Sequence, residues 1–295
     1  MPSVMAYRKC PDIIFVKPRF DVYKEVSMVI RDIFLEYTDL VEPLSLDEAY
    51  LDVTNNKPGL PSATLIAKEI RQKIFDKTGL TCSAGISINK FLAKTASDIN
   101  KPNGMKLIRP EDAISFIETL KIKDFFGVGK VTAEKMKRMG IHTGADLKTK
   151  SIGFLTKNFG KSGAYYYNIC RGIDDRPVNP NRIRKSVSIE NTYDNDLTES
   201  EDIISALQQL SFALEKRLSK NSIKGKTVNV KIKYADFEQV TRSKTASVWL
   251  GNSVDYDSLW REIMLDQQLI NKPIRLLGLG LSNLSTELDD KQGLQ

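Results

Sequence analysis

The chain has 295 residues, of which 41% are hydrophobic and 27% charged, a globular composition that predicts two or three domains at roughly 100–200 residues each. Lys and Arg outnumber Asp and Glu by 44 to 37, which gives a net charge of +7. There is no apolar run long enough to cross a bilayer, no signal-peptide layout and no cysteine framework, so we expect a soluble cytoplasmic protein.

The first 108 residues alternate helices with short strands. Apolar residues recur every three or four positions over residues 19–38 and predict an amphipathic helix, with its stripe at Val22, Val26, Val29, Ile33 and Tyr37. Residues 41–54 are predicted to form strand, tight turn and strand. Ser62 and Gly79 are suited to begin and end the next helix, and a further helix over residues 89–100 precedes the strand MKLI. This alternation predicts helices packed against one sheet.

The rest of the chain divides into two regions of different pattern. Short helices separated by glycines are expected over residues 110–175, where no strand pattern is found. Residues 176–184 contain two prolines, two asparagines and three arginines, a composition typical of a linker. Beyond it, two helices (residues 199–219 and 254–268) interrupt four strands in the order β-α-β-β-α-β, which predicts a second, smaller α+β domain.

The positive charge is confined to one of these regions. Residues 121–176 hold 12 basic and 5 acidic side chains, so this block alone accounts for the net charge of +7. Such a basic block is typical of a nucleic-acid contact. A solubilising surface has the same composition, and charge alone does not separate the two interpretations.

Two adjacent carboxylates, Asp47 and Glu48, interrupt an otherwise apolar stretch. Burying them is costly unless a positive charge compensates them, and at a sharp hairpin both can face one ion. Hard oxygen ligands favour Mg²⁺, and a carboxylate-bound metal pair stabilises phosphoryl transfer. An acidic turn that faces solvent is the alternative. Lys101, between a helix and the turn at Pro102–Gly104, is suited either to neutralise a triphosphate or to face solvent.

Two further segments have features of nucleic-acid contacts. Gly127-Val128-Gly129-Lys130 would direct backbone N–H groups at a phosphate, as in a helix-hairpin-helix. A Walker A loop or a dinucleotide fingerprint is excluded, because the required residues are absent at positions 124, 131 and 132. Over Thr227–Tyr234, apolar residues alternate with Asn229, Lys231 and Lys233, which predicts one apolar face and one basic face that either lies along a duplex or faces solvent.

Taken in order, these segments resemble the Y-family translesion DNA polymerases, and most closely their bacterial DNA polymerase IV branch. The resemblance is carried by Ser45–Asp52, Cys82–Lys94, Lys101–Gly104 and Gly127–Lys130. The little-finger domain of that branch is resembled by residues 184–192 and 233–243.

The resemblance implies an α+β multidomain fold, a right-handed polymerase with an α+β palm, a helix-hairpin-helix thumb and an α+β little finger. The expected division is a remnant of the fingers at residues 1–18, the palm at 19–108, the thumb at 109–175, the linker at 176–184 and the little finger at 185–290.

The resemblance also implies template-directed nucleotidyl transfer by an error-prone polymerase at damaged or stalled DNA, with two Mg²⁺ ions. Asp47 would bind metal, Glu48 would lie at the attacking 3′-hydroxyl, and Lys101 would contact the incoming triphosphate. The implied DNA-binding residues are Gly127, Gly129, Lys130, Arg184, Lys185, Lys231, Arg242 and Lys244.

The ends of the chain depart from the family pattern. No residue of Met1–Phe20 matches the family's first metal-binding aspartate, so we expect a palm without one interior strand and a chain that is nearly or wholly inactive as written. Lys291–Gln295 resembles the start of a sliding-clamp-binding tail that lacks its hydrophobic residues. The expected partners of this monomer are primer–template DNA, deoxynucleoside triphosphates and the sliding clamp. A non-catalytic DNA-binding protein and a nucleotide cyclase remain the alternatives.

Overall fold

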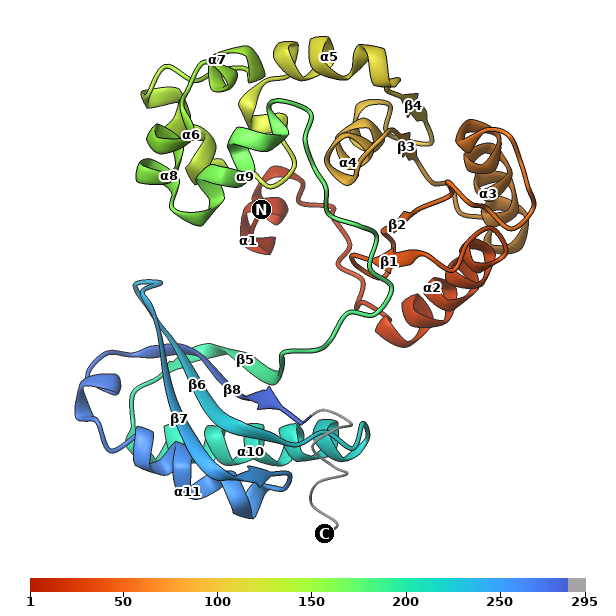
Figure 1. The fold of residues 1–295 in the computed structure, drawn as a ribbon. Coiled ribbons are helices and arrows are strands. Elements are labelled where there is room, and N and C mark those ends of the chain that lie inside the picture. Colours follow the sequence, from red (N-terminus) through yellow and green to blue (C-terminus); the bar gives the residue numbers. More distant parts are fainter. Residues whose placement is uncertain (286–295) are drawn as a thin grey trace. The chain divides into compact units, whose positions relative to one another are not determined.

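The computed structural model describes residues 1–285, which form two compact units that divide between Arg182 and Ile183 (Figure 1). No helix within these residues is both long and apolar enough to cross a membrane.

The first part of the first unit consists of helices and two pairs of strands. Its elements are α1 (Ser3–Lys9), α2 (Phe20–Leu35), β1 (Val41–Pro43), β2 (Ala49–Leu51), α3 (Ala63–Thr78), β3 (Ala84–Ile86), α4 (Lys90–Ile99) and β4 (Met105–Leu107). The expected caps are confirmed: the Ser62 side chain accepts a hydrogen bond from Thr64 N–H, and Gly79 ends α3 with a φ of 70°. Of the expected apolar stripe of α2, Ile33 and Tyr37 lie in the core and Val22 and Val26 are half-buried, whereas Val29 is exposed and Ile30 packs against the core instead.

The expectation of a single sheet in this part is wrong. β1 and β2 pair antiparallel, β3 and β4 pair parallel, and no strand of the described residues joins the two pairs. Each pair is three residues long, so its stability depends on the helices packed against it rather than on a continuous ladder.

Short helices make up the second part of the first unit, as expected from its glycine spacing. They are η1 (Pro110–Asp112), α5 (Ala113–Thr119), η2 (Ile122–Asp124), α6 (Lys130–Arg138), α7 (Gly144–Lys148), α8 (Ile152–Phe159) and α9 (Lys161–Ile169). Their core also contains Phe91, Leu92 and Ala96 of α4. Helix α4 therefore belongs to the core of the helical region and also packs against β3 and β4.

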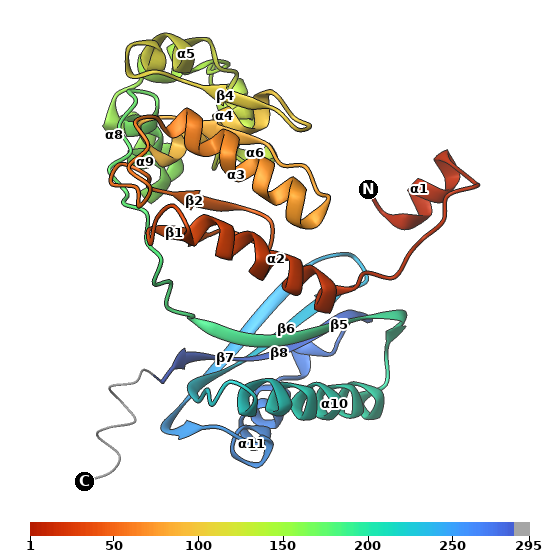
Figure 2. The ribbon, with the colours of Figure 1, turned by 90° about the vertical axis from the view of Figure 1, so that its right-hand side faces the viewer.

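The second unit is a four-stranded antiparallel sheet with two helices on one face (Figure 2). Its elements are β5 (Ser186–Leu197), α10 (Ser200–Ser219), β6 (Gly225–Tyr234), β7 (Gln239–Leu250), α11 (Ser253–Ile263), η3 (Gln267–Leu269) and β8 (Ile274–Leu284). The strands lie in the order β5-β8-β6-β7, and the expected β-α-β-β-α-β sequence is confirmed. Burial alternates along β6 as the sequence indicated, with Val228, Val230, Ile232 and Tyr234 in the core.

Helix α4 approaches β3 so closely that only glycine fits between them. A Cβ atom at Gly85 would lie 1.9 Å from the carbonyl oxygen of Ala93 and 2.3 Å from the amide nitrogen of Ser97. Since both of these atoms belong to the helix backbone, a side chain at Gly85 would push α4 off the strand pair.

We predict that Gly85→Ala destabilises the first unit by about 1–3 kcal/mol, the usual cost of overpacking a core. Gly153→Ala is the matched control, because no atom lies within 4 Å of its Cβ position in α8. It should leave the free energy of unfolding unchanged or raise it. Urea unfolding followed by circular dichroism measures both, and equal stability of the two variants would contradict the close packing.

Candidate active site

The two sequence-predicted carboxylates lie in the turn between β1 and β2. The backbone N–H groups of Leu44 and Ser45 donate to the carbonyl oxygen of Glu48, at 2.8 and 3.4 Å, and close the turn. Ser45 Oγ donates to Asp47 Oδ1 at 2.5 Å and accepts from Asp47 N–H at 3.3 Å. Ser45, two residues earlier in the turn, therefore fixes the Asp47 side chain, and Glu48 lies immediately before β2.

Helix α4 brings positive charge to this turn. Lys94 Nζ lies 3.3 Å from Glu48 Oε1 and 3.2 Å from Asp98 Oδ2, and its side chain is only 12% exposed. Lys101 Nζ lies 2.5 Å from the other oxygen of Asp98. The structure thus brings Glu48 and Lys101 to one cluster and adds two residues, Lys94 and Asp98, that were not among the predicted site residues. The available signal was the spacing of four residues from Lys94 to Asp98 along α4, with Lys101 three residues further on, just beyond the helix.

The charges in this cluster shift one another's titration. The hydrogen bond to Asp98 raises the pKa of Lys101, and the nearby carboxylates of Glu48 and Asp47 add to this effect. Burial raises the pKa of Asp98, but the hydrogen bonds from Lys101 and Lys94 outweigh it, so this pKa lies below its ordinary value. Both groups are therefore held in their charged forms at neutral pH.

The donor set fits a divalent ion held jointly with a substrate. Asp47 and Glu48 offer hard carboxylate oxygens, and Mg²⁺ is commonly bound through one or two carboxylates together with phosphates and water. Within residues 1–285 no three His, Cys, Asp or Glu side chains converge on one point. The described residues alone thus provide donors for one such ion rather than a complete cage for two.

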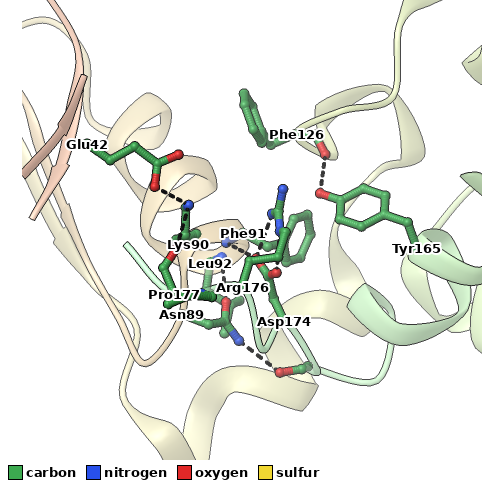
Figure 3. Close-up of polar contacts among 11 residues, drawn as sticks. Glu42, Asn89, Lys90, Phe91, Leu92, Phe126, Tyr165, Asp174, Arg176 and Pro177 are labelled. Atoms are coloured by element: carbon green, nitrogen blue, oxygen red, sulfur yellow. Dashed lines mark hydrogen bonds and ion pairs between the residues drawn. The ribbon is translucent and has the colours of Figure 1, made fainter. Parts of the chain in front are cut away.

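The segment after α9 holds the N-terminus of α4 in place (Figure 3). Asp174 Oδ2 accepts from Phe91 N–H at 2.9 Å, and Asn89 Nδ2 donates to the carbonyl oxygen of Gly172 at 2.8 Å. Arg176 makes two hydrogen bonds to Asp174, whose side chain is 2% exposed. The first turn of α4 is therefore capped by a residue 83 positions further along the chain.

A second contact ties the same segment to β1. Lys90 Nζ donates to Glu42 Oε2 at 2.5 Å and to the carbonyl oxygen of Pro177 at 3.0 Å. Glu42 Oε2 also accepts from Asn179 N–H at 2.8 Å. Burial raises the pKa of Glu42, but the hydrogen bonds from Asn179 and Lys90 lower it by more. The pKa of Glu42 therefore lies below its ordinary value. β1, α4 and residues 172–179 thus form one connected junction.

The predicted hairpin presents the N-terminus of α6. Gly127 has a φ of +91°, Gly129 caps the helix, and Lys130 is its exposed first residue. The element before the hairpin is the short 3₁₀ helix η2 rather than a longer helix. Lys130 forms no ion pair with any other described residue, so its charge is available to a ligand at this helix end.

In the second unit the predicted DNA-binding residues lie on two faces of the sheet. Residues directly opposite one another in an antiparallel pair share a face. Lys231 is opposite Thr241, on the face that carries no helix, and forms an ion pair with Glu190 at 2.8 Å. Arg242 and Lys244 are opposite the buried Val230 and Val228, which places them on the helix-bearing face.

On the helix-bearing face, Lys244 forms an ion pair with Glu262 of α11. Arg184 and Lys185 are exposed in the segment before β5. The structure therefore does not bring Arg242 and Lys244 together with Lys231 on one surface.

Known proteins match nearly the whole chain. Residues 1–98 match the impB/mucB/samB family, residues 184–294 match the C-terminal domain of that family, and residues 123–174 match the DNA polymerase-iota thumb domain. DNA polymerase IV 2 of Agrobacterium fabrum is 53% identical over 97% of this chain and 80% of its own length. DNA polymerase IV of Leptospira interrogans is 50% identical over 98% of this chain and 82% of its own length.

A solved structure agrees with these matches. A Y-family DNA polymerase chimera, 27% identical in sequence, superimposes with a TM-score of 0.85 over 96% of this chain and 82% of its own. The chain therefore belongs to the Y family of DNA polymerases. The family resemblance and the α+β multidomain polymerase fold with a helix-hairpin-helix thumb and a little-finger sheet are confirmed. The expected function, translesion synthesis by a DNA-directed DNA polymerase, is confirmed as well.

We predict that Asp174→Asn destabilises the first unit at neutral pH by about 1.5–3 kcal/mol, the worth of hydrogen bonds to a charged group. Burial raises the pKa of Asp174, while Arg176 and the N–H of Phe91 lower it more, so the folded-state pKa lies below the unfolded value of about 3.9. The charged form then stabilises the fold above that value and loses its effect as pH falls through the folded-state pKa.

Urea unfolding of both proteins between neutral and acidic pH tests this. The difference between wild type and Asp174→Asn should be constant near neutral pH and should shrink only below about pH 4. Asp175→Asn, at the exposed neighbouring position, is the control and should cost little. A pH-independent difference, or an equal loss from Asp175→Asn, would contradict the role of the Asp174 carboxylate.

Proposed function

We propose that the turn at residues 44–48 and helix α4 form the active site of a translesion polymerase, which extends a primer by template-directed nucleotidyl transfer at damaged or stalled DNA. The observation that carries this proposal is the cluster of Asp47 and Glu48 with Lys94, Asp98 and Lys101, in a chain that belongs to the Y family of DNA polymerases. Lys94, from a separate helix, pairs with Glu48, and Lys101 lies near the charges of both carboxylates, a concentration of positive charge that suits an anionic substrate.

Each residue of the cluster has a proposed part in the reaction. Asp47 holds the metal, Glu48 lies at the attacking 3′-hydroxyl, and Lys101 binds the incoming triphosphate. Lys101 now pairs with Asp98, and exchanging this carboxylate for a triphosphate keeps the ammonium group neutralised in both states. The protein's own contribution is then mainly orientation and charge neutralisation.

The proposed cofactor is Mg²⁺, with two ions as the full complement. Bound here, the metal would stabilise the charge that develops on the attacking and leaving oxygens. Asp47 and Glu48 are its protein donors among the described residues, so a second ion would have to take most of its ligands from phosphate oxygens and water.

The proposed DNA contacts lie in both units. The N-terminus of α6 at Gly129–Lys130 is suited to a backbone phosphate, because exposed N–H groups and a lysine meet there. In the second unit we assign the contact to the helix-free face of the sheet, with Lys231, and to Arg184 and Lys185 before β5.

We propose that the chain acts as a monomer in the cytoplasm, where bacterial DNA is found. The clamp-binding segment expected at residues 291–295 lies outside the described residues.

We predict that Glu48→Gln lowers primer extension by at least about 100-fold, the usual scale for removing one group that stabilises a transition state. Extension is measured on a primed template with Mg²⁺ and four deoxynucleotides, for the chain and for a form extended upstream in the same reading frame. The comparison is made in whichever form is active. Glu25→Gln, at an exposed position of α2, is the control and should retain full activity.

The outcomes separate the proposal from its alternatives. Unimpaired extension by Glu48→Gln would contradict the active-site assignment. Intact DNA binding without extension in either form would favour a non-catalytic DNA-binding protein, and a cyclic product formed without template would favour a cyclase.

We also predict that Lys231→Ala weakens binding to a primer–template several-fold and lowers the salt dependence by about one ion, because it removes one phosphate contact. Lys244→Ala should change neither quantity, since Lys244 lies on the helix-bearing face beside Glu262. Fluorescence anisotropy of labelled DNA between about 50 and 200 mM salt measures both. A larger loss from Lys244→Ala than from Lys231→Ala would show that the other face binds DNA.

A further inference from the structure

An arginine outside the cluster of Asp47, Glu48, Lys94, Asp98 and Lys101 forms hydrogen bonds to the loop that carries Lys101. Arg71 lies on α3, and its Nε donates to the carbonyl oxygen of Cys82 at 2.9 Å. Its Nη2 donates to both the carbonyl oxygen and the side-chain oxygen of Asn103, at 2.8 and 2.6 Å. The planar guanidinium group thus joins the segment before β3 to the loop between α4 and β4, a two-sided contact that a single ammonium group cannot reproduce.

Hydrogen bonds and close packing also fix the other residues of this loop. Gly104 N–H donates to Ser83 Oγ at 3.2 Å, and the Gly104 carbonyl accepts from Ala84 N–H at 3.0 Å. Asn103 has a φ of +49°, in the left-handed region, and a Cβ at Gly104 would lie 1.9 Å from the carbonyl oxygen of Asn100. Asn is one of the few residues besides glycine that adopts this conformation, and its two contacts to Arg71 hold the loop in it.

The position of the Lys101 side chain depends on the conformation of this loop. Its backbone is two residues from Asn103, while its ammonium group reaches Asp98 and lies near the charges of Asp47 and Glu48. The side chain is half exposed and flexible, so the position of its backbone decides how often the ammonium group reaches the cluster. Arg71 itself is directed at Cys82 and Asn103 rather than at the cluster.

We propose that Arg71 is a positioning residue for nucleotide binding: it fixes the loop at residues 100–104 so that Lys101 is presented to the triphosphate of the incoming nucleotide. This inference rests on the proposed function, in which Lys101 is the triphosphate ligand. Arg71 acts only through Lys101 and makes no contact with the nucleotide.

The test is a double-mutant cycle on nucleotide affinity. Equilibrium binding of dATP is measured in the presence of Mg²⁺, with the chain bound to a primer–template whose primer ends in a dideoxynucleotide and whose next template base is thymine. The readout is a dissociation constant, so it does not depend on turnover. The proteins are wild type, Arg71→Ala, Lys101→Ala, the double variant, and Lys68→Ala as the control from the preceding turn of α3.

We expect Lys101→Ala to weaken dATP binding about 10-fold, and Arg71→Ala to weaken it about 3- to 10-fold, the effect of losing one or two hydrogen bonds. The double variant should bind no more weakly than Lys101→Ala, because Arg71 has nothing left to position. Arg71→Lys should remain weakened, since it restores the charge but not the two-sided contact. Lys68→Ala and the affinity for DNA should be unchanged.

Several results would overturn the inference. Additive losses in the double variant, or full recovery in Arg71→Lys, would mean that Arg71 acts on the nucleotide by its own charge. Unchanged binding in Arg71→Ala, with Lys101→Ala weakened, would reject the inference and leave the proposed function intact. If Lys101→Ala binds dATP as wild type does, or wild type does not bind it, the proposed function fails and the inference fails with it.

A second variant covers the case in which Arg71→Ala does not fold. Asn103→Gly removes the side-chain acceptor of Arg71, keeps the positive φ of this position unstrained and leaves α3 unchanged. It should weaken dATP binding in the same direction, by about 2- to 5-fold, and again only when Lys101 is present. Unchanged binding in this variant would contradict the inference.

Discussion

Charge compensation between the acidic turn and helix α4 is the interaction on which the proposed active site depends. Glu48 comes from the turn immediately before β2 and Lys94 from α4, and the two residues are far apart in the chain. Asp47 is exposed and Glu48 is 39% exposed, so Lys94 serves mainly to place positive charge beside the carboxylates rather than to compensate their burial. The geometry of the site is therefore set by whatever holds α4.

Three separate features hold this helix. Its apolar side shares a core with the helical region, its backbone lies directly on Gly85 of β3, and its first turn is capped by Asp174 from the segment after α9. The helical region and the carboxylate turn are thus linked through one ten-residue helix. A displacement of the helical region can therefore reach the carboxylate turn through α4, and also through the contacts of Glu42 with Lys90 and Asn179.

The sequence predicted those parts of the fold that depend on neighbouring residues. Caps at Ser62 and Gly79, the strand–turn–strand around Asp47 and the alternation along β6 are all local, and all are confirmed. Family membership was also accessible, because several motifs occur in a fixed order. The division of the palm strands into two pairs was not predictable, since strand pairing is decided by contacts between distant segments.

The candidate site also depends on contacts between residues that are distant in the chain. Asp47, Glu48 and Lys101 were found from their own motifs, but the ion pair of Lys94 with Glu48 and the grip of Arg71 on Asn103 join residues 46 and 32 positions apart. The register of β7 against β6 decides which face of the sheet Arg242 and Lys244 occupy, and the sequence of β7 alone does not reveal this register.

The most direct test of the central claim is to locate a bound metal in solution. Mn²⁺ takes the oxygen ligands of Mg²⁺ and broadens nearby amide resonances in nuclear magnetic resonance spectra. With a dideoxy-terminated primer–template and a matching nucleotide, we predict broadening at residues 45–48 and 94–101 that is lost when Asp47→Asn and Glu48→Gln are combined. Broadening centred elsewhere, or unchanged in that double variant, would show that the turn and α4 are not the metal and nucleotide site.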